Sequence, residues 1–338
     1  MKLFNNKGEQ SMKKALMICM GIAALVVFSS PAFSAVSGVC SECHTMHNSQ
    51  GNAVMATGGP HPTLLMNNCL GCHTTTGTDP LAAGYPYVSG SGFDDDGCLA
   101  GGFFPDTMGT GNNDDDHHGI GNNNAPAGYD ATEYAAYSGV ANGLACAGSN
   151  GCHGVSTALD DMESIAGGHH NPTAYRILYD AADAAVTGDG ATDYEEAIID
   201  GSTTTVTYGT TANLYNAGGT GVTINALCAK CHGDFHKTST EGAGETTNTG
   251  GAWIRHPTEN SIPTDWTIYA AAIDADDVKH NPVGYEGAVS NANKRVMCIS
   301  CHRAHGTANA DLLRWAYSTQ DAGSGLEYGC LGCHNKQR

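Results

Sequence analysis

The chain has 338 residues, of which 34 are Asp or Glu and 15 are Lys or Arg, so its formal net charge is −19 at pH 7. This acidity argues against nucleic acid and anionic lipid as partners, because both select basic surfaces. Glycine is abundant, at 45 residues, and large aliphatic side chains are sparse beyond the N-terminal segment, so side chains alone would build only a small core.

The N-terminal segment is typical of a secretory signal peptide. Lys13 and Lys14 precede the apolar run ALMICMGIAALVVF, and small residues follow it. We predict a signal peptide over residues 1–35, with Met12 as an alternative start, and a mature domain over residues 36–338. The apolar run is too short to argue for a retained membrane helix, so we expect a secreted protein that passes through the periplasm and has no membrane span.

Few regular elements are predicted after the signal. Short helices are expected at 131–139, 193–199 and 310–318, and a strand is expected at 203–209. The Asp tracts at 94–96 and 114–116 are either solvated loops or sites for divalent cations. The Gly, Asn and Pro content predicts loop elsewhere. The expected fold is therefore mostly irregular loops with a few short helices and minimal β structure.

The cysteines form a repeated motif that can supply the apolar surface missing from the side chains. Apart from Cys19 in the signal and Cys98, which we interpret as a structural or incidental thiol, every cysteine belongs to a pair followed at once by histidine. Five pairs have the spacing C-x-x-C-H, which attaches a c-type haem through two thiols and ligates its iron through the histidine. Disulfides would not require those histidines, and paired C-x-x-C units for one zinc usually lie closer together. The predicted attachment and proximal residues of these five sites are Cys40, Cys43 and His44; Cys69, Cys72 and His73; Cys228, Cys231 and His232; Cys298, Cys301 and His302; and Cys330, Cys333 and His334.

The remaining pair, CAGSNGCH, has three extra residues. Taken alone, Cys146 and Cys152 before His153 would be either a sixth haem site or a disulfide loop. With five regular sites in the same chain, we interpret the stretch as the third of six haem sites. The extra residues must then bulge away from the porphyrin while the two thiols keep their reach.

Ten histidines remain as candidates for the second axial ligand of each iron. This surplus favours bis-His coordination, in which no iron is left open to substrate. His61 has the weakest case, and one member of the pair His117 and His118 is expected to bind. The predicted distal ligands are His47, His118, His169, His170, His236, His256, His280 and His305.

Several stretches resemble a known family. CSECHTMHNSQG, AYRIL, CAKCHGDFH followed by WIRHP, and VMCISCHRAHGTANADLLRW are similar to extracellular multihaem cytochromes of metal-reducing bacteria, of the six-haem OmcS type with OmcE-type relatives. The resemblance implies a single multihaem cytochrome c domain whose stacked haems continue from subunit to subunit of a filament. It implies that His47 ligates a haem of the neighbouring subunit, on Cys298 and Cys301. OmcE-type relatives also carry a C-x5-C-H site followed by HH, which supports the third site; OmcS-type proteins have C-x-x-C-H there.

The expected function is long-range extracellular electron transfer by a homopolymer with six covalent, bis-His haems, exchanging electrons with partner cytochromes and with extracellular acceptors such as metal oxides. A soluble monomeric electron carrier is the alternative. A multihaem oxyanion reductase is a third possibility, but it needs an open iron, and the C-x-x-C-K motif that marks the familiar nitrite-reducing type does not occur. We therefore expect an electron-transfer protein, not an enzyme.

Overall fold

The computed structural model describes residues 39–56, 61–76, 87–90, 101–104, 118, 120, 144–157, 161–165, 169–170, 174, 177–180, 182–189, 214–215, 222–235, 258, 261–262, 283–286, 293–321 and 329–334. Several predictions fall on other residues: the signal peptide, Cys98, both Asp tracts, the helices at 131–139 and 193–199, the strand at 203–209, and four histidines. These histidines are His117, His236, His256 and His280.

Helices in the described part are short, because most of them consist of one haem-binding motif or one turn beside it. The α-helices are α2 (Cys69–His73), α3 (Asp161–Ser164), α4 (Ile224–Ala229) and α6 (Cys330–His334). The 3-10 helices are η1 (Cys40–Glu42), η2 (Pro62–Leu64), η4 (Gly148–Asn150), η6 (Gly233–Phe235), η10 (Cys298–Ser300), η11 (Ala310–Leu312) and η12 (Tyr317–Thr319). Two α-helices begin at a side-chain cap: Asn68 accepts a hydrogen bond from the Gly71 amide, and Thr223 accepts one from the Ala226 amide.

Each sheet among the described residues has two strands. The antiparallel pairs are β1 (Ser49–Gln50) with β2 (Ala53–Val54), β7 (Gly188–Asp189) with β8 (Leu214–Tyr215), and β9 (Gly284–Tyr285) with β10 (Lys294–Arg295). The parallel pairs are β3 (Thr74–Thr75) with β4 (Ser89–Gly90), and β5 (Ala145–Ala147) with β6 (Gly151–His153). The predicted fold class, mostly loops with few short helices and minimal β structure, is confirmed for the described residues.

The helix predicted at 310–318 is wrong. That stretch forms the separate turns η11 and η12, because Asp311 and Leu312 adopt left-handed backbone angles, with φ of 59° and 56°. An α-helix cannot continue through such residues. Leu313 instead forms an antiparallel bridge with His302, so tertiary pairing overrides local helix propensity here.

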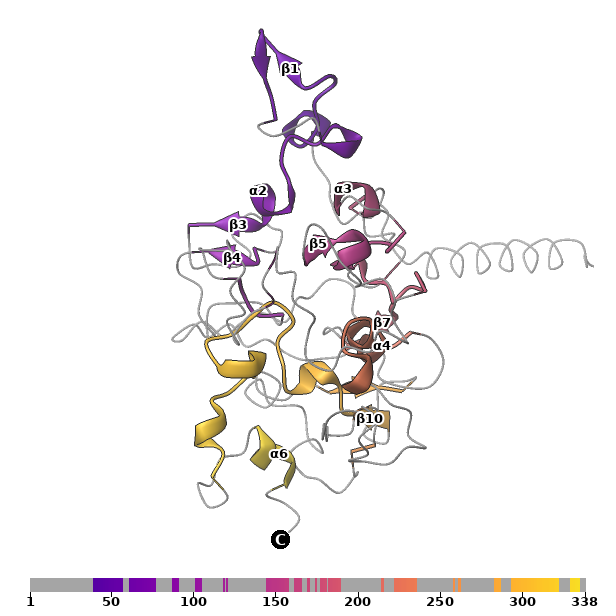
Figure 1. Ribbon diagram of the computed structural model, residues 1–338, viewed down its shortest axis with the longest axis vertical. Helices are drawn as coiled ribbons and strands as arrows, with labels where there is room; N and C mark the ends of the chain where they lie inside the picture. The colour runs from indigo at the N-terminus through magenta and orange to yellow at the C-terminus, as the bar shows by residue number, and fades with distance from the viewer. Residues whose placement is uncertain are drawn as a thin grey trace, which may run out of the picture.

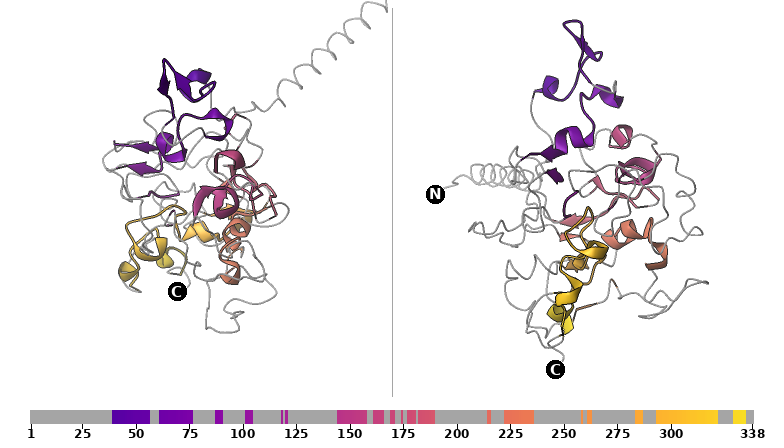
Figure 2. Two further views of the ribbon diagram at one scale, coloured as in Figure 1. Left: turned by 45° about the horizontal axis from the view of Figure 1, so that its top comes forward. Right: turned by 60° about the vertical axis from the view of Figure 1, so that its left-hand side comes forward.

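The motifs follow one another along the long axis of the molecule. Figure 1 shows the hairpin of β1 and β2 at one end, then α2 and β5, then α4, and finally α6 near the C-terminus at the other end. In the other views the indigo hairpin and the yellow C-terminal segment again lie toward opposite ends (Figure 2). The hairpin end is exposed and partly apolar, with Met46 at 84% and Val54 at 71% exposure.

The described apolar core is small, as the composition predicted. Its main cluster contains only Leu178, Val186, Ile224, Leu227 and Met297. The buried charged side chains of the described residues are all basic, although the chain as a whole is acidic; they are Lys230, Lys294, Arg303 and Arg314. A small apolar core, together with buried cations, suits a fold that is organised by large ligands carrying carboxylates.

Replacing Gly102 with alanine will destabilise the haem-loaded protein by roughly 2–6 kcal/mol, since it adds backbone strain and overpacking. Gly102 has a φ of +80°, and a Cβ there would collide with the carbonyl oxygen of Gly306. The matched control is Gly51→Ala, where φ is +57° and nothing lies within 4 Å; it should cost only about 1–2 kcal/mol of strain. Denaturant unfolding of the two variants measures the difference, and equal losses would contradict the prediction.

Candidate haem centres

Each regular motif winds into one helical turn. The amide of the motif histidine donates to the carbonyl of the first cysteine, at 2.8 Å for His44, 3.0 Å for His232 and 3.1 Å for His302. The two CLGCH motifs coincide with α2 and α6. In a helical turn, side chains three and four residues apart lie together, which is the arrangement that one porphyrin requires.

The third site reaches a comparable arrangement by another route. Cys146 lies in β5 and Cys152 in β6, and the two strands pair in parallel with Ala147 opposite His153. The intervening Gly148–Asn150 form the turn η4, in which Gly148 has a φ of +82°. The extra residues are thus folded into a turn while the strands carrying the two cysteines run side by side.

The proximal imidazoles are oriented by the backbone. Nδ1 of His44 lies 2.9 Å from the Thr63 carbonyl oxygen, and Nδ1 of His302 lies 2.7 Å from that of Asp311. A carbonyl only accepts, so Nδ1 carries the proton in each ring and Nε2 is the free ligand atom. His118 is held in the same way, with Nδ1 at 2.6 Å from the Ala304 carbonyl oxygen.

Four of the six motif histidines face a second histidine across a gap. In each pair one ring follows a cysteine motif and the other comes from a distant segment. The pairs and their centroid separations are His44 with His170 at 6.0 Å, His73 with His169 at 6.2 Å, His153 with His305 at 6.4 Å, and His232 with His118 at 6.2 Å. These rings are too far apart for direct contact. With metal–nitrogen distances of about 2.0–2.1 Å, an ion between two imidazoles separates their centroids by roughly 6 Å. The four pairs therefore fit bis-His iron.

Two of the distal rings are held in the neutral form that binds metal. Burial, followed by the neighbouring imidazoles of His153 and others, lowers the pKa of His305 to about 3. Burial also lowers the pKa of His169, and the imidazole of His73 adds to this effect. A neutral imidazole offers its lone pair without first losing a proton.

The other predicted ligands are placed differently. His47 is exposed beside the β1–β2 hairpin, and His61 precedes η2; the described ring contacts include neither. The second ligands of the last two motifs, whose proximal residues are His302 and His334, are not assigned by the described ring contacts. His236, His256 and His280 lie outside those residues.

Thiols of successive motifs lie close enough to interact electrostatically. For each step from the first motif to the fifth, a cysteine of one motif interacts with a cysteine of the next. The interacting pairs are Cys43 with Cys72, Cys69 with Cys146, Cys152 with Cys231, and Cys228 with Cys298. In the second and fourth pairs the thiols are hydrogen-bonded, and this bond, together with burial, raises the pKa of Cys69 and Cys228. The attachment points thus form one series in sequence order.

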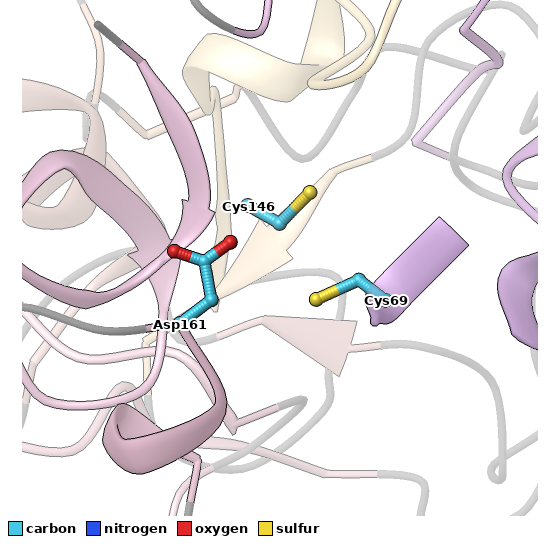
Figure 3. A group of neighbouring side chains, drawn as sticks. All are labelled: Cys69, Cys146 and Asp161. Atoms are coloured by element: carbon cyan, nitrogen blue, oxygen red, sulfur yellow. The ribbon is translucent and has the colours of Figure 1, made fainter. Parts of the chain in front are cut away.

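Charged side chains lie at two of these junctions. Burial raises the pKa of Cys152, and the ammonium of Lys230 opposes that rise. Burial and the nearby Cys152 raise the pKa of Cys231 to about 12, and the Lys230 ammonium again opposes the rise. At the preceding junction, Asp161, Cys69 and Cys146 place their carboxylate and sulfur atoms within 4.8 Å of one another (Figure 3).

A structural repeat, which we call the clasp, recurs at the first, third and fifth motifs. In each clasp the motif histidine forms an antiparallel bridge with a leucine downstream: His44 with Leu65, His153 with Leu178, and His302 with Leu313. The residue before each leucine has a left-handed backbone: φ is 57° at Leu64, 60° at Ile177 and 56° at Leu312. Its carbonyl accepts the amide that follows the motif histidine, at 2.9, 2.8 and 2.9 Å.

The clasp is a feature that sequence reasoning missed. Its only signal is the recurrence of TLL at 63–65, RIL at 176–178 and DLL at 311–313, after loops of different length. The strained backbone at Leu64, Ile177 and Leu312 indicates a position that the fold imposes, since left-handed angles are rare for such residues. The odd-numbered motifs therefore share a geometry, and the chain contains three tandem pairs of motifs.

Comparison with known proteins gives related findings. Residues 290–338 match the family model described as the doubled CXXCH motif. Among solved structures, the chain is similar to the outer membrane cytochrome S filament from Geobacter sulfurreducens, with 18% identity over 84% of each chain and a TM-score of 0.43. It is also similar to the OmcS nanowires from Geobacter sulfurreducens, with 18% identity over 82% of this chain and 83% of that chain, and a TM-score of 0.42. No curated protein matches the chain.

The doubled haem-binding motif is thus found at the C-terminal pair of sites, and the similar structures are of the OmcS type that the sequence motifs predicted. Within the described residues, no helix is long and apolar enough to cross a membrane.

Proposed function

We propose that the chain is an exported, single-domain hexahaem c-type cytochrome that polymerises and transfers electrons over long distances outside the cell. The observation that carries this proposal is the set of four histidine pairs at 6.0–6.4 Å, each containing one motif histidine. Haem supplies one-electron chemistry, and two histidines on its iron leave no position for a substrate. Partner cytochromes and acceptors such as metal oxides are the proposed sources and destinations of the electrons.

The pairs also assign distal ligands. His170 and His169 serve the first and second motifs, while His305 and His118 serve the third and fourth. In each case two consecutive sites draw on neighbouring residues: His169 and His170 are adjacent in sequence, and the His118 amide donates to the His305 carbonyl at 3.0 Å. Consecutive haems are therefore held by shared segments, which supports one unbroken series.

The clasp repeat supports polymerisation through His47. His305 follows the proximal histidine of the fifth motif by three residues, and His47 follows that of the first motif by three residues. His305 serves the third motif, which carries the preceding clasp. The first clasp has no preceding clasp within the described residues. In a polymer, the preceding clasp belongs to the neighbouring subunit and is the one at Cys298, Cys301 and His302. His47, exposed at one end of the molecule, is the proposed ligand of that site.

Electron paramagnetic resonance tests the proposal that all six irons are bis-His. The wild-type protein should show only low-spin ferric signals, and His305→Ala should convert one of the six haems to high spin, because His153 loses its opposite ligand. The matched control is Phe104→Leu, which alters a ring 4.9 Å from His305 but removes no ligand. A high-spin signal from wild-type protein would favour the reductase, and its absence from His305→Ala would remove that assignment. Negative-stain microscopy of native material separates the polymer from the monomeric carrier.

A further inference from the structure

Two junctions between successive haem motifs carry side chains of opposite charge, one buried and one half-buried. Lys230 lies where the third motif meets the fourth, and Asp161 lies where the second meets the third. Neither residue attaches or ligates a haem under the proposed function.

Lys230 connects the third and fourth motifs directly. Its side chain is 3% exposed, and its Nζ donates to the carbonyl oxygen of Gly151 at 3.1 Å. Gly151 precedes the attachment residue Cys152, and Lys230 precedes Cys231. The ammonium therefore lies beside the attachment points of two successive haems and is shielded from solvent.

Asp161 occupies the corresponding position one junction earlier. Figure 3 shows its carboxylate converging with the sulfur atoms of Cys69 and Cys146, which belong to the second and third motifs. The residue begins α3, and the Asp161 carbonyl accepts the Ser164 hydroxyl at 2.8 Å, so the local backbone is fixed.

A fixed charge beside a haem changes its reduction potential. Reduction removes one positive charge from the iron centre, so a nearby cation favours the reduced form and a nearby anion favours the oxidised form. The effect is strong in a protein interior, where water screens charges poorly.

We infer that Lys230 raises the reduction potentials of the haems on the third and fourth motifs, and that Asp161 lowers those on the second and third. The two charges oppose each other at the third haem, so the largest difference falls between the second and the fourth. Each protomer then has a potential step in the middle of its haem series, and electrons reside preferentially on the fourth-motif side. The inference rests on the proposed haem assignment and adds the residues that set the energies.

The test is a potentiometric titration of the purified holoprotein, followed by haem absorbance. Lys230→Gln keeps an N–H donor for the Gly151 carbonyl but removes the charge. It should lower the reduction potential of one or two of the six haems. The expected shift changes the ratio of reduced to oxidised form at least tenfold, which is about 59 mV for one electron. Asp161→Asn, which is nearly isosteric, should shift one or two haems in the opposite direction.

The matched control is Lys230→Arg, which retains the charge and should keep the reduction potentials close to those of the wild type. Shifts of the same sign in Lys230→Gln and Asp161→Asn would indicate that water enters the site, and would overturn the inference. Equal shifts in Lys230→Gln and Lys230→Arg would also overturn the inference. Intact mass gives the number of haems in every sample: five in the wild type would overturn the proposed function together with this inference, whereas six with unchanged potentials would overturn this inference alone.

Discussion

A variant lacking both thiols of the third motif, Cys146→Ala with Cys152→Ala, will carry five covalent haems where the wild-type protein carries six. The two cysteines lie on paired strands, and His153 faces His305 at 6.4 Å, so under the proposed function the site has both attachment points and both axial ligands. Without thiols no thioether bonds form, and haem held by the two imidazoles alone is lost on denaturation. Intact mass spectrometry under denaturing conditions counts the haems that remain.

A deletion provides the matched control for this variant. Removing Gly148–Asn150, the turn η4, joins Ala147 to Gly151 and turns CAGSNGCH into the regular motif CAGCH. This protein should retain six haems, because the regular spacing attaches haem elsewhere in the same chain. If the wild-type protein had five haems and a disulfide between Cys146 and Cys152, the third site would be a disulfide loop and the prediction would fail.

Replacing His47 with alanine will abolish filaments and leave one haem in six without its second ligand. The exposed ring at the hairpin end is the proposed ligand of the neighbouring subunit's haem on Cys298 and Cys301, so its loss removes a coordination bond across the interface. Negative-stain microscopy should show separate protomers, and electron paramagnetic resonance should show one high-spin haem.

Two further measurements separate ligation by His47 from simple surface contact. Added imidazole should restore the low-spin signal of His47→Ala without restoring filaments, since a free ligand occupies the open coordination position of the iron but does not join subunits. Gln50→Ala alters another exposed residue of the same hairpin and should leave both filaments and spectra unchanged. Filaments of normal appearance from His47→Ala would contradict the proposed intersubunit ligand.

The sequence predicted the haem motifs because their chemistry is local: two thiols and an imidazole within one turn. It also predicted the loop-rich fold, since Gly, Asn and Asp tracts leave little apolar periodicity. The prediction of a helix at 310–318 was wrong because the bridge between His302 and Leu313 imposes a left-handed backbone at Asp311 and Leu312. Helix propensity carries no information about such a bridge. The assignment of His305 to the third motif also depends on a contact between residues far apart in sequence.

Lys230 shows a different limit of sequence reasoning. In CAKCH it occupies one of the variable positions of the motif, where lysine is ordinarily exposed to solvent. Only the packing of the third motif against the fourth buries it, and only the Gly151 carbonyl indicates which way its side chain extends. Composition and spacing contain no signal for such a contact.

The clasp has a consequence for the seam between protomers. If His47 of the first clasp ligates the fifth motif of the next subunit as His305 ligates the third motif, the seam between protomers repeats an arrangement already present inside each chain. The coordination of the haem at the seam would then match that of the third haem inside each chain, whereas the proposed potentials still repeat once per protomer. Covalent continuity of the polypeptide would be irrelevant to conduction, and the ends of a protomer would be no greater barrier than its middle.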